Sequence, residues 1–319
     1  MNSSPEQQSS IADLIARLAP QDGDYPSAIS GLSLHRRSAP TRPVRLDYKP
    51  SLAFVAQGAK SVMLGHEHFS YGSDEYLLTS IGLPVLTRVT EASVEHPFLC
   101  FLLNIDMLQI NQLISEMRLP LRATKPIACG IALGQVSAPL HDASMRLLRL
   151  LAQPEATQAI TTLAPLIQKE IAFHLLAGPQ GDRLRHMAVL DSRTHRIGRA
   201  MEWIKENFAL QLRIAELAER VHMSMSSLHH HFKEVTLMTP MQYQKLLRLE
   251  GARRLMLIDM LDAGAAGHRV GYHSASQFSR EYARRYGQAP MRDIAQARLQ
   301  LQGGALLAYD GAGSQAGAV

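Results

Sequence analysis

Two matching helical patterns in the last third of the chain restrict its fold more than any other feature. Apolar residues spaced i, i+3, i+4 and i+7 give the first helix one buried stripe, formed by Ile214, Leu217, Ala218 and Val221. The chain then turns through residues 222–224, and Ser224 is a good N-cap for a second helix. That helix buries three residues spaced i, i+4 and i+7, which are Leu228, Phe232 and Val235. A helix, a short turn and another helix form the helix-turn-helix arrangement.

The same device recurs 50 residues later, where Ser274 repeats the cap at Ser224. The helix that follows has an aromatic buried face, formed by Phe278, Tyr282 and Tyr286. Gly287 is a suitable C-cap for this helix, and Pro290 follows three residues later. The sequence therefore predicts an all-α C-terminal region with two helix-turn-helix units.

A long helix is predicted between the two units. It starts at Thr239-Pro240, an N-cap followed by a proline at the first helical position. Its roughly 17 residues span about 25 Å, so it could hold the units a fixed distance apart. Gly251 interrupts this helix, and Gly264 and Gly267 fall in the first helix of the second unit. Since an interior glycine costs about 1 kcal/mol relative to alanine, we expect Gly267→Ala to raise thermal stability.

The outer faces of both second helices are polar, and the region around them is basic. Residues 193–298 hold 17 Lys and Arg against 10 Asp and Glu, a net charge of +7, whereas the remainder carries −2. Phosphate backbones are the common partners of such a surface. The candidate contacts in the first unit are Ser226, Ser227, His229, His230 and Lys233. Those in the second unit are Ser276, Gln277, Ser279, Arg280 and Arg284. Arg280 is the strongest base-reading candidate, because arginine paired with guanine is the commonest specific contact.

The N-terminal half has a different pattern. Between residues 44 and 105, short apolar runs alternate with turn glycines, which is typical of a sandwich or barrel. These runs are 52–57, 60–64, 75–79, 84–89 and 97–103. Helical spacing follows in three stretches, at 107–119, 141–151 and 163–176, which could form a dimerisation surface. The fold class is therefore α+β, with a β-rich domain before the helical one.

Three stretches closely resemble the AraC/XylS family of bacterial transcription regulators: LRIAELAERVHMSMSSLHHHFKEVT, MTPMQYQKLLRLEGARRLML and RVGYHSASQFSREYARRYGQAPMRD. The last is the most specific, because it carries the family pattern G-Y/F-x-S-x-S-x-F-S-R-x-Y/F-x-x-x-x-G-x-x-P. The resemblance implies recognition helices in adjacent major-groove segments, about 34 Å apart. It places base contacts at Ser226, His229, His230, Ser276, Gln277 and Arg280. Leu237 departs from the family, which usually has a glycine at the end of the first recognition helix.

The N-terminal part resembles one branch of this family, which has a cupin-like sensor domain, then helices, then a stretch like LAPLIQKEIAFHLLAGPQG. Some relatives in that branch respond to aldehydes or other electrophiles. The expected organisation is a polar arm (1–24), a cupin-like sensor and dimerisation domain (25–177), a linker (178–193), a DNA-binding domain (194–300) and a disordered tail (301–319).

Two histidine clusters suggest metal binding but favour other interpretations. His66 and His68 imitate the HxH of metal-binding cupins, yet the nearest following glutamate, Glu75, is seven residues on, so a solvated turn fits better. His229, His230 and His231 point about 100° apart on a helix and cannot converge on one ion. We expect no metal site and no cofactor. Because histidine titrates near neutrality, DNA binding is expected to weaken as pH rises.

The chain has two cysteines, Cys100 and Cys129. Cys100 stands in an apolar run and reads as a core residue, but it could also be a sensing thiol if a cation lowers its pKa. His96 and Arg88 are the cations nearest to it in sequence. Cys129 adjoins Gly130 and is expected to be the more exposed thiol. Two thiols make no disulfide framework, so a reducing cytoplasm is favoured.

Several function classes find no support in the sequence. It has no Gly-rich phosphate loop, no G-x-S-x-G elbow and no HExxH, so no catalytic residue is assigned. The polar N-terminus is unlike a secretion signal, and no apolar run approaches a membrane span. We therefore expect a cytoplasmic, nucleoid-associated regulator of transcription that is not an enzyme. It would bind promoter DNA, respond to a small molecule or electrophile, form a homodimer and contact RNA polymerase as an activator.

Two alternatives stay open. The cupin-like domain could be a metal-dependent enzyme fused to DNA-binding helices. The N-terminal domain could also serve only to dimerise a constitutive DNA-binding protein that has no effector.

Overall fold

The computed structural model describes residues 10–117, 129–153, 157–188 and 193–302. Internal contacts divide the chain into two compact units: Met1–Met201 with Ala218–Thr239, and Glu202–Leu217 with Pro240–Val319. Helices α6 (Arg193–Glu206) and α7 (Ile214–Arg220) run across this division. The first unit is rich in strands and the second is helical, so the predicted α+β class is confirmed.

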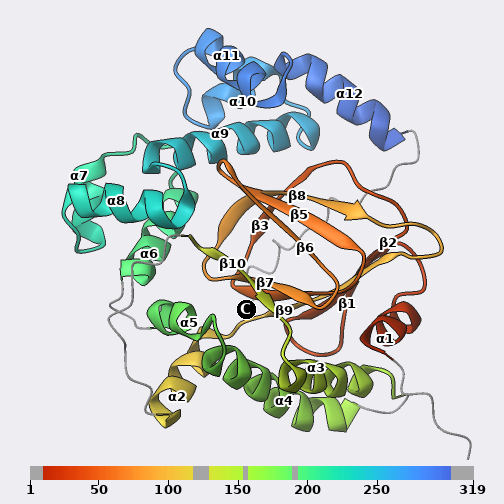
Figure 1. Ribbon diagram of the computed structural model, residues 1–319. Helices are drawn as coiled ribbons and strands as arrows, with labels where there is room; N and C mark the ends of the chain where they lie inside the picture. Colours follow the sequence, from red (N-terminus) through yellow and green to blue (C-terminus); the bar gives the residue numbers. More distant parts are fainter. Residues whose placement is uncertain (1–9, 118–128, 154–156, 189–192, 303–319) are drawn as a thin grey trace, which may run out of the picture. The chain divides into compact units, whose positions relative to one another are not determined.

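The strands of the first unit form two antiparallel sheets (Figure 1). The larger has the order β1 (Gly23–Pro26), β2 (Leu32–Arg37), β9 (Phe98–Asn104), β4 (Ser51–Gln57), β7 (Glu75–Thr79) and β10 (Ile131–Gln135). The smaller has the order β3 (Val44–Tyr48), β8 (Leu83–Glu91), β5 (Ala59–Leu64) and β6 (Glu67–Gly72). The five apolar runs singled out in the sequence correspond to β4, β5, β7, β8 and β9. The other strands carry more polar residues and gave no comparable signal.

One face of the larger sheet packs against helices. These are α1 (Ile11–Leu18), α2 (Met107–Met117), α3 (Ala138–Leu151), α4 (Thr157–Ala177) and α5 (Gly181–Ala188). Phe54 and Phe101, on neighbouring strands of this face, stack with their ring centres 5.0 Å apart. Side chains two residues apart on a strand share a face, so β9 turns Leu99, Phe101 and Leu103 toward the helices and Cys100 toward the smaller sheet.

Two segments that the sequence suggested were peripheral belong to this core. Within the expected polar arm (1–24), α1 begins with a capping box between Ser10 and Asp13 and buries Ile11, Leu14 and Ile15. Within the expected linker (178–193), α5 forms, and Leu184 is fully buried. The sequence shows a short amphipathic spacing for α1, in Ile11, Leu14, Ile15 and Leu18, whereas the polar composition of the expected linker hid the apolar face of α5.

The second unit is built around the long helix that was predicted, α9 (Pro240–Leu257). It packs with α10 (Ala263–Arg269), α11 (Ala275–Tyr286) and α12 (Pro290–Gln302) around one core. Four aromatic rings follow one another through this core, with centres 5.3, 5.5 and 4.4 Å apart in the order Tyr272, Phe278, Tyr282 and Tyr286. None of the described helices combines the length and apolar character that crossing a bilayer requires.

Gly267 overturns one expectation from the sequence. A Cβ atom at this position would lie 2.9 Å from Cγ and 3.0 Å from Cδ1 of Phe278, which is closer than real contacts allow. The glycine lets α10 approach the fully buried Phe278 of α11. Gly267→Ala is therefore expected to lower stability, because the gain in helix propensity is smaller than the effect of overpacking.

Candidate nucleic-acid interface

In the first predicted helix-turn-helix unit, the second helix is α8 (Met225–Thr236). Ser224 caps it by accepting a hydrogen bond of 3.2 Å from the backbone N–H of Ser227. Leu237 ends it in the left-handed conformation, with φ of 58°, where a glycine would be unstrained. The predicted inner face is confirmed, since Leu228, Phe232 and Val235 are buried.

The predicted DNA contacts of α8 lie on its accessible side. Ser226, His229, His230 and Lys233 are exposed, and Ser227 is half-buried. Lys233 forms no ion pair with the acidic residues that the structure describes. Its ammonium group is therefore available to a phosphate.

The carboxylate of Glu234 lies close to two of the three consecutive histidines of α8. Oε2 of Glu234 lies 2.7 Å from Nδ1 of His231, and its Oε1 lies 3.7 Å from Nε2 of His230. Among the described residues, His230, His231 and Glu234 form one group that could hold a metal ion. One ligand atom from each of these side chains lies within 4.8 Å of the others. The three histidines do not converge, as expected, and His229 stays outside the group. Glu234, which lies one helical turn beyond His230, was not among the residues predicted from the sequence.

The second predicted recognition helix, α11, has the expected caps. Ser274 accepts a hydrogen bond of 3.3 Å from the backbone N–H of Gln277, and Gly287 ends the helix with φ of 82°. The inner face is confirmed, with Phe278 and Tyr282 fully buried and Tyr286 half-buried.

The predicted contacts of α11 are also accessible. Ser276, Gln277, Arg280 and Arg284 are exposed, and Ser279 is half-buried. The Gln277 amide donates to Oε1 of Glu281 at 3.4 Å. Neither Arg280 nor Arg284 pairs with an acidic residue in the described part of the chain. Two unpaired guanidinium groups on one accessible helix face can donate to phosphates or to guanine.

The linker helix α9 connects the loop that precedes the first helix-turn-helix unit to the turn of the second helix-turn-helix unit. Nε2 of the buried Gln244 donates to the carbonyl oxygens of Phe208 and Leu210, at 3.0 and 2.6 Å. One turn on, the Arg248 guanidinium donates to Phe208 (2.7 Å), Ala209 (3.2 Å) and Leu210 (2.8 Å). It also donates to the carbonyl of Gly271 at 3.0 Å. A single side chain thus joins the loop before α7 to the turn between α10 and α11.

Gly271 makes this junction sterically feasible. Its φ is 93°, and a Cβ atom there would lie only 2.1 Å from the carbonyl oxygen of Ala209. Gln244, Arg248 and Gly271 were not among the residues predicted from the sequence. The available signal was a pair of polar side chains, four residues apart, among the apolar residues on the buried side of the helix.

The two cysteines proposed for thiol sensing are both sheltered from solvent, Cys100 more than Cys129. Cys100 is 2% exposed, and burial raises the pKa of its thiol to about 11. The charges that act on it come from Lys60 and Asp24, whereas His96 and Arg88 are exposed. Cys129 is half-buried, and burial raises the pKa of its thiol too. Burial thus acts against a lowered thiol pKa at both positions, and thiol sensing stays a prediction.

The HxH motif falls in a β-turn. Gly65, with φ of 60°, and His66 form the turn between β5 and β6, and His68 is exposed on β6. Both imidazoles are solvated, as the sequence interpretation favoured.

Comparison with known proteins gives matches in both parts of the chain. The N-terminal model of AraC-type transcriptional regulators matches residues 28–183, and a helix-turn-helix domain model matches residues 217–295. The HTH-type transcriptional activator RhaS of Escherichia coli strain SE11 is 28% identical over 159 residues, which are 50% of this chain and 56% of RhaS. RhaS of E. coli K12 (DH10B) is 27% identical over the same length. The chain thus spans about half the length of the curated relatives that it matches.

Among solved structures, ToxT from Vibrio cholerae O395 bound to (E)-4-(8-methylnaphthalen-1-yl)but-3-enoic acid superposes with a TM-score of 0.50. The match covers 83% of this chain and 97% of ToxT, at 12% sequence identity. At that identity the likeness concerns the fold alone.

Proposed function

Since the chain belongs to the AraC family of transcriptional regulators, we propose that it binds promoter DNA in a sequence-specific manner through its two helix-turn-helix units. The observation that carries this proposal is the outer face of α11. There, Arg280 and Arg284 are exposed and unpaired, while Phe278 and Tyr282 anchor the opposite face in the core. A rigidly held helix with free cations is what major-groove reading requires.

We assign separate roles to the accessible residues. Base reading falls to Ser276, Gln277 and Arg280 in α11 and to Ser226, His229 and His230 in α8. Phosphate contacts fall to Lys233 and Arg284, with the hydroxyl groups of Ser227 and Ser279 as further donors. Phosphate contacts position a protein on the duplex, whereas contacts to base edges specify the sequence.

The N-terminal domain would supply regulation. A small-molecule effector that binds it can change DNA binding only by its different affinity for two states of the protein. We propose activation through contact with RNA polymerase as the outcome, within the cytoplasm and on the nucleoid.

The outer surface of α3 and α4 supports a homodimer. Leu163, Leu166 and Phe173 are 43%, 61% and 40% exposed on α4. A groove of about 450 Å³ lies beside two of them and is bordered by Arg146 and Glu170. Exposed apolar side chains that gather on one helix mark interaction surfaces.

Mapping of the binding sites across the genome, followed by titration of the purified protein with one recovered site, tests the proposal. We expect binding that weakens steeply with salt and that exceeds binding to shuffled DNA of equal length by a factor of about 10³ or more. Equal affinity for both duplexes at every salt concentration would exclude sequence-specific regulation. Analytical ultracentrifugation of the wild type and of Leu166→Glu tests the dimer separately.

A further inference from the structure

A lysine on the inner side of the smaller sheet has no carboxylate partner. Lys60 of β5 is opposite Tyr71 of β6 and Val89 of β8 in the strand registers. Val62 and Leu64 follow at two-residue intervals and are fully buried, so the Lys60 side chain lies on the same inner face. Lys60 is half-buried, and burial is the largest influence on the pKa of its ammonium group. No ion pair joins Lys60 to an acidic group of the described chain.

The aromatic ring of Tyr48 lies beside the ammonium group of Lys60. The ammonium nitrogen lies 5.4 Å from the centre of the Tyr48 ring, and Tyr48 acts to raise its pKa. The Tyr48 hydroxyl directs its own proton to Oγ1 of Thr87 at 3.2 Å, and Thr87 donates onward to the carbonyl of Ser61 at 3.2 Å. Tyr48 thus directs its proton away from Lys60, and the ammonium group of Lys60 forms no hydrogen bond with a carbonyl or carboxylate oxygen of the described chain.

Tyr71 presents a second donor without an acceptor. The residue is 2% exposed, and its hydroxyl has no hydrogen-bond partner in the structure. Burial, together with the neighbouring Tyr48 and Cys100, raises its pKa well above the usual value, so the hydroxyl keeps its proton. Buried polar atoms are nearly always hydrogen-bonded, so an unpartnered hydroxyl on the residue opposite Lys60 indicates a missing acceptor.

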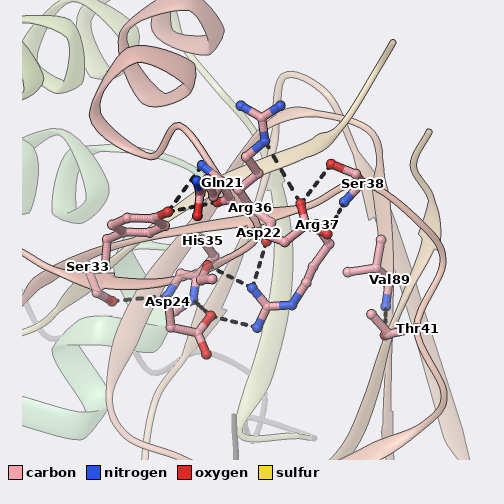
Figure 2. Close-up of polar contacts among 12 residues, drawn as sticks. Gln21, Asp22, Asp24, Ser33, His35, Arg36, Arg37, Ser38, Thr41 and Val89 are labelled. Carbon is pink, nitrogen blue, oxygen red and sulfur yellow. Dashed lines mark hydrogen bonds and ion pairs between the residues drawn. The ribbon is translucent and has the colours of Figure 1, made fainter. Parts of the chain in front are cut away.

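Asp24, an acidic group that acts on the neighbouring Cys100, is already committed to other partners, as Figure 2 shows. Oδ1 of Asp24 lies 2.7 Å from Nδ1 of His35 and 2.7 Å from Nη2 of Arg37. Burial acts to raise the pKa of Asp24, but His35 and Arg37 together hold it well below its usual value. The positive charge of Arg37 acts on Lys60 as well. Two cations and one carboxylate therefore leave a positive excess between the sheets.

We propose that Lys60 and Tyr71 bind the carboxylate group of a small organic effector between the two sheets of the N-terminal domain. The Lys60 ammonium would pair with the carboxylate, and the Tyr71 hydroxyl would donate to one of its oxygens. Val62 and Val89 line the same inner face, so the rest of the molecule would be apolar. This inference rests on the proposed function, because it names the ligand class to which the regulator responds.

The chemistry of the neighbours favours an anion over an aldehyde. Burial lowers the pKa of Lys60, but the Tyr48 phenol and the Cys100 thiol raise it by more, so the amine stays protonated. A protonated amine does not attack a carbonyl carbon. The buried Cys100 thiol, with its pKa raised to about 11, is likewise a poor nucleophile at neutral pH.

The test is a titration of the full-length protein with acetate, butyrate, hexanoate and benzoate, each beside its uncharged amide. We expect at least one carboxylate to bind saturably and to raise the melting temperature, while its amide does not. Lys60→Met should abolish this binding, and Tyr71→Phe should weaken it about tenfold or more. Lys49→Met, which removes an exposed lysine of the same domain, is the matched control and should bind like the wild type.

Three outcomes would overturn the site: no carboxylate binds better than its amide, Lys60→Met binds as tightly as the wild type, or Lys49→Met loses binding equally. Circular dichroism and DNA titration of each variant confirm that it is folded. If the protein binds its DNA site but no carboxylate, only the effector site is excluded. If it binds a carboxylate but no DNA, the proposed function fails instead.

Discussion

The hydroxyl of Tyr282 donates a 2.7 Å hydrogen bond to Oδ2 of Asp293. The same oxygen accepts a hydrogen bond of 2.8 Å from Nε of Arg253. One carboxylate thereby links α11, α9 and α12, the helices that frame the second helix-turn-helix unit. Burial, and then the hydrogen bond to Asp293, raise the pKa of Tyr282, so the phenol remains a donor throughout the physiological range.

Tyr282→Phe removes this hydrogen bond and leaves the ring packing in place. Because the acceptor is a largely buried carboxylate, we expect the free energy of unfolding to fall by about 1.5–3 kcal/mol. Urea unfolding followed by circular dichroism measures the change. Gln296→Ala, on the exposed side of α12, is the control. If the free energy of unfolding fell as much in Gln296→Ala as in Tyr282→Phe, the hydrogen bond to Asp293 would not account for the loss of stability.

Arg248→Lys tests the hydrogen bonds that join the loop before the first helix-turn-helix unit to the turn of the second. Lysine retains the charge but cannot donate to the carbonyls of Phe208, Leu210 and Gly271 at once, because it lacks the planar fork of arginine. We expect a lower melting temperature and weaker binding to a full DNA site. Arg254→Lys, at an exposed position of the same helix, should change neither quantity. If Arg248→Lys matched this control, the carbonyl contacts would not position the units.

Two glycine variants should shift stability in opposite directions. Gly267→Ala forces a methyl group against the ring of Phe278 and should destabilise the protein by about 1–3 kcal/mol. At Gly198, inside α6, a Cβ atom would meet nothing closer than 4.0 Å, so alanine should stabilise by up to about 1 kcal/mol. Differential scanning calorimetry of both variants gives the two signs. A rise in melting temperature for Gly267→Ala would contradict the packing argument.

Asp24 should make stability depend on acid. The pKa of this carboxyl is lowered on folding, so its contribution is complete above the unfolded-state pKa of about 3.9 and is lost as pH falls through the lower folded-state value. Asp24→Asn should therefore be less stable than the wild type at pH 7 and should lose less stability on acidification. Unfolding at a series of pH values between 7 and 2 compares the two proteins. Parallel curves would mean that Asp24 has the same pKa in both states.

The sequence predicted the helices of both helix-turn-helix units well, because capping residues and the spacing of apolar residues mark where short helices begin, end and pack. Ser224, Ser274 and Gly287 all occupy the predicted cap positions. Periodicity identifies the buried face of a helix but does not identify what that face meets. The contact between Gly267 and Phe278 therefore escaped prediction.

The polar groups inside the N-terminal domain were beyond sequence reasoning for a related reason. In the sequence, Lys60 and Tyr71 look like ordinary polar residues of two strands whose side chains alternate between faces. Only the pairing of β5 with β6 places them opposite each other. Cys100 drew attention through its chemistry, yet its environment depends on strands that lie far from it in sequence, β1 and β5. Chemical identity can be read from one residue, but a pKa depends on all of its neighbours.

Arg280→Ala and Lys233→Ala should separate base reading from phosphate binding. We expect Arg280→Ala to weaken binding to the recovered DNA site by about 1–3 kcal/mol and to relax the preference at a single base pair. Lys233→Ala should weaken binding to specific and shuffled duplexes alike and should reduce the slope of log affinity against log salt by about 1. Fluorescence anisotropy at several salt concentrations supplies both quantities, with Arg254→Ala as the control for loss of an exposed charge. Equal losses of Arg280→Ala on specific and shuffled DNA would mean that Arg280 contacts a phosphate, and α11 would then need another residue to read bases.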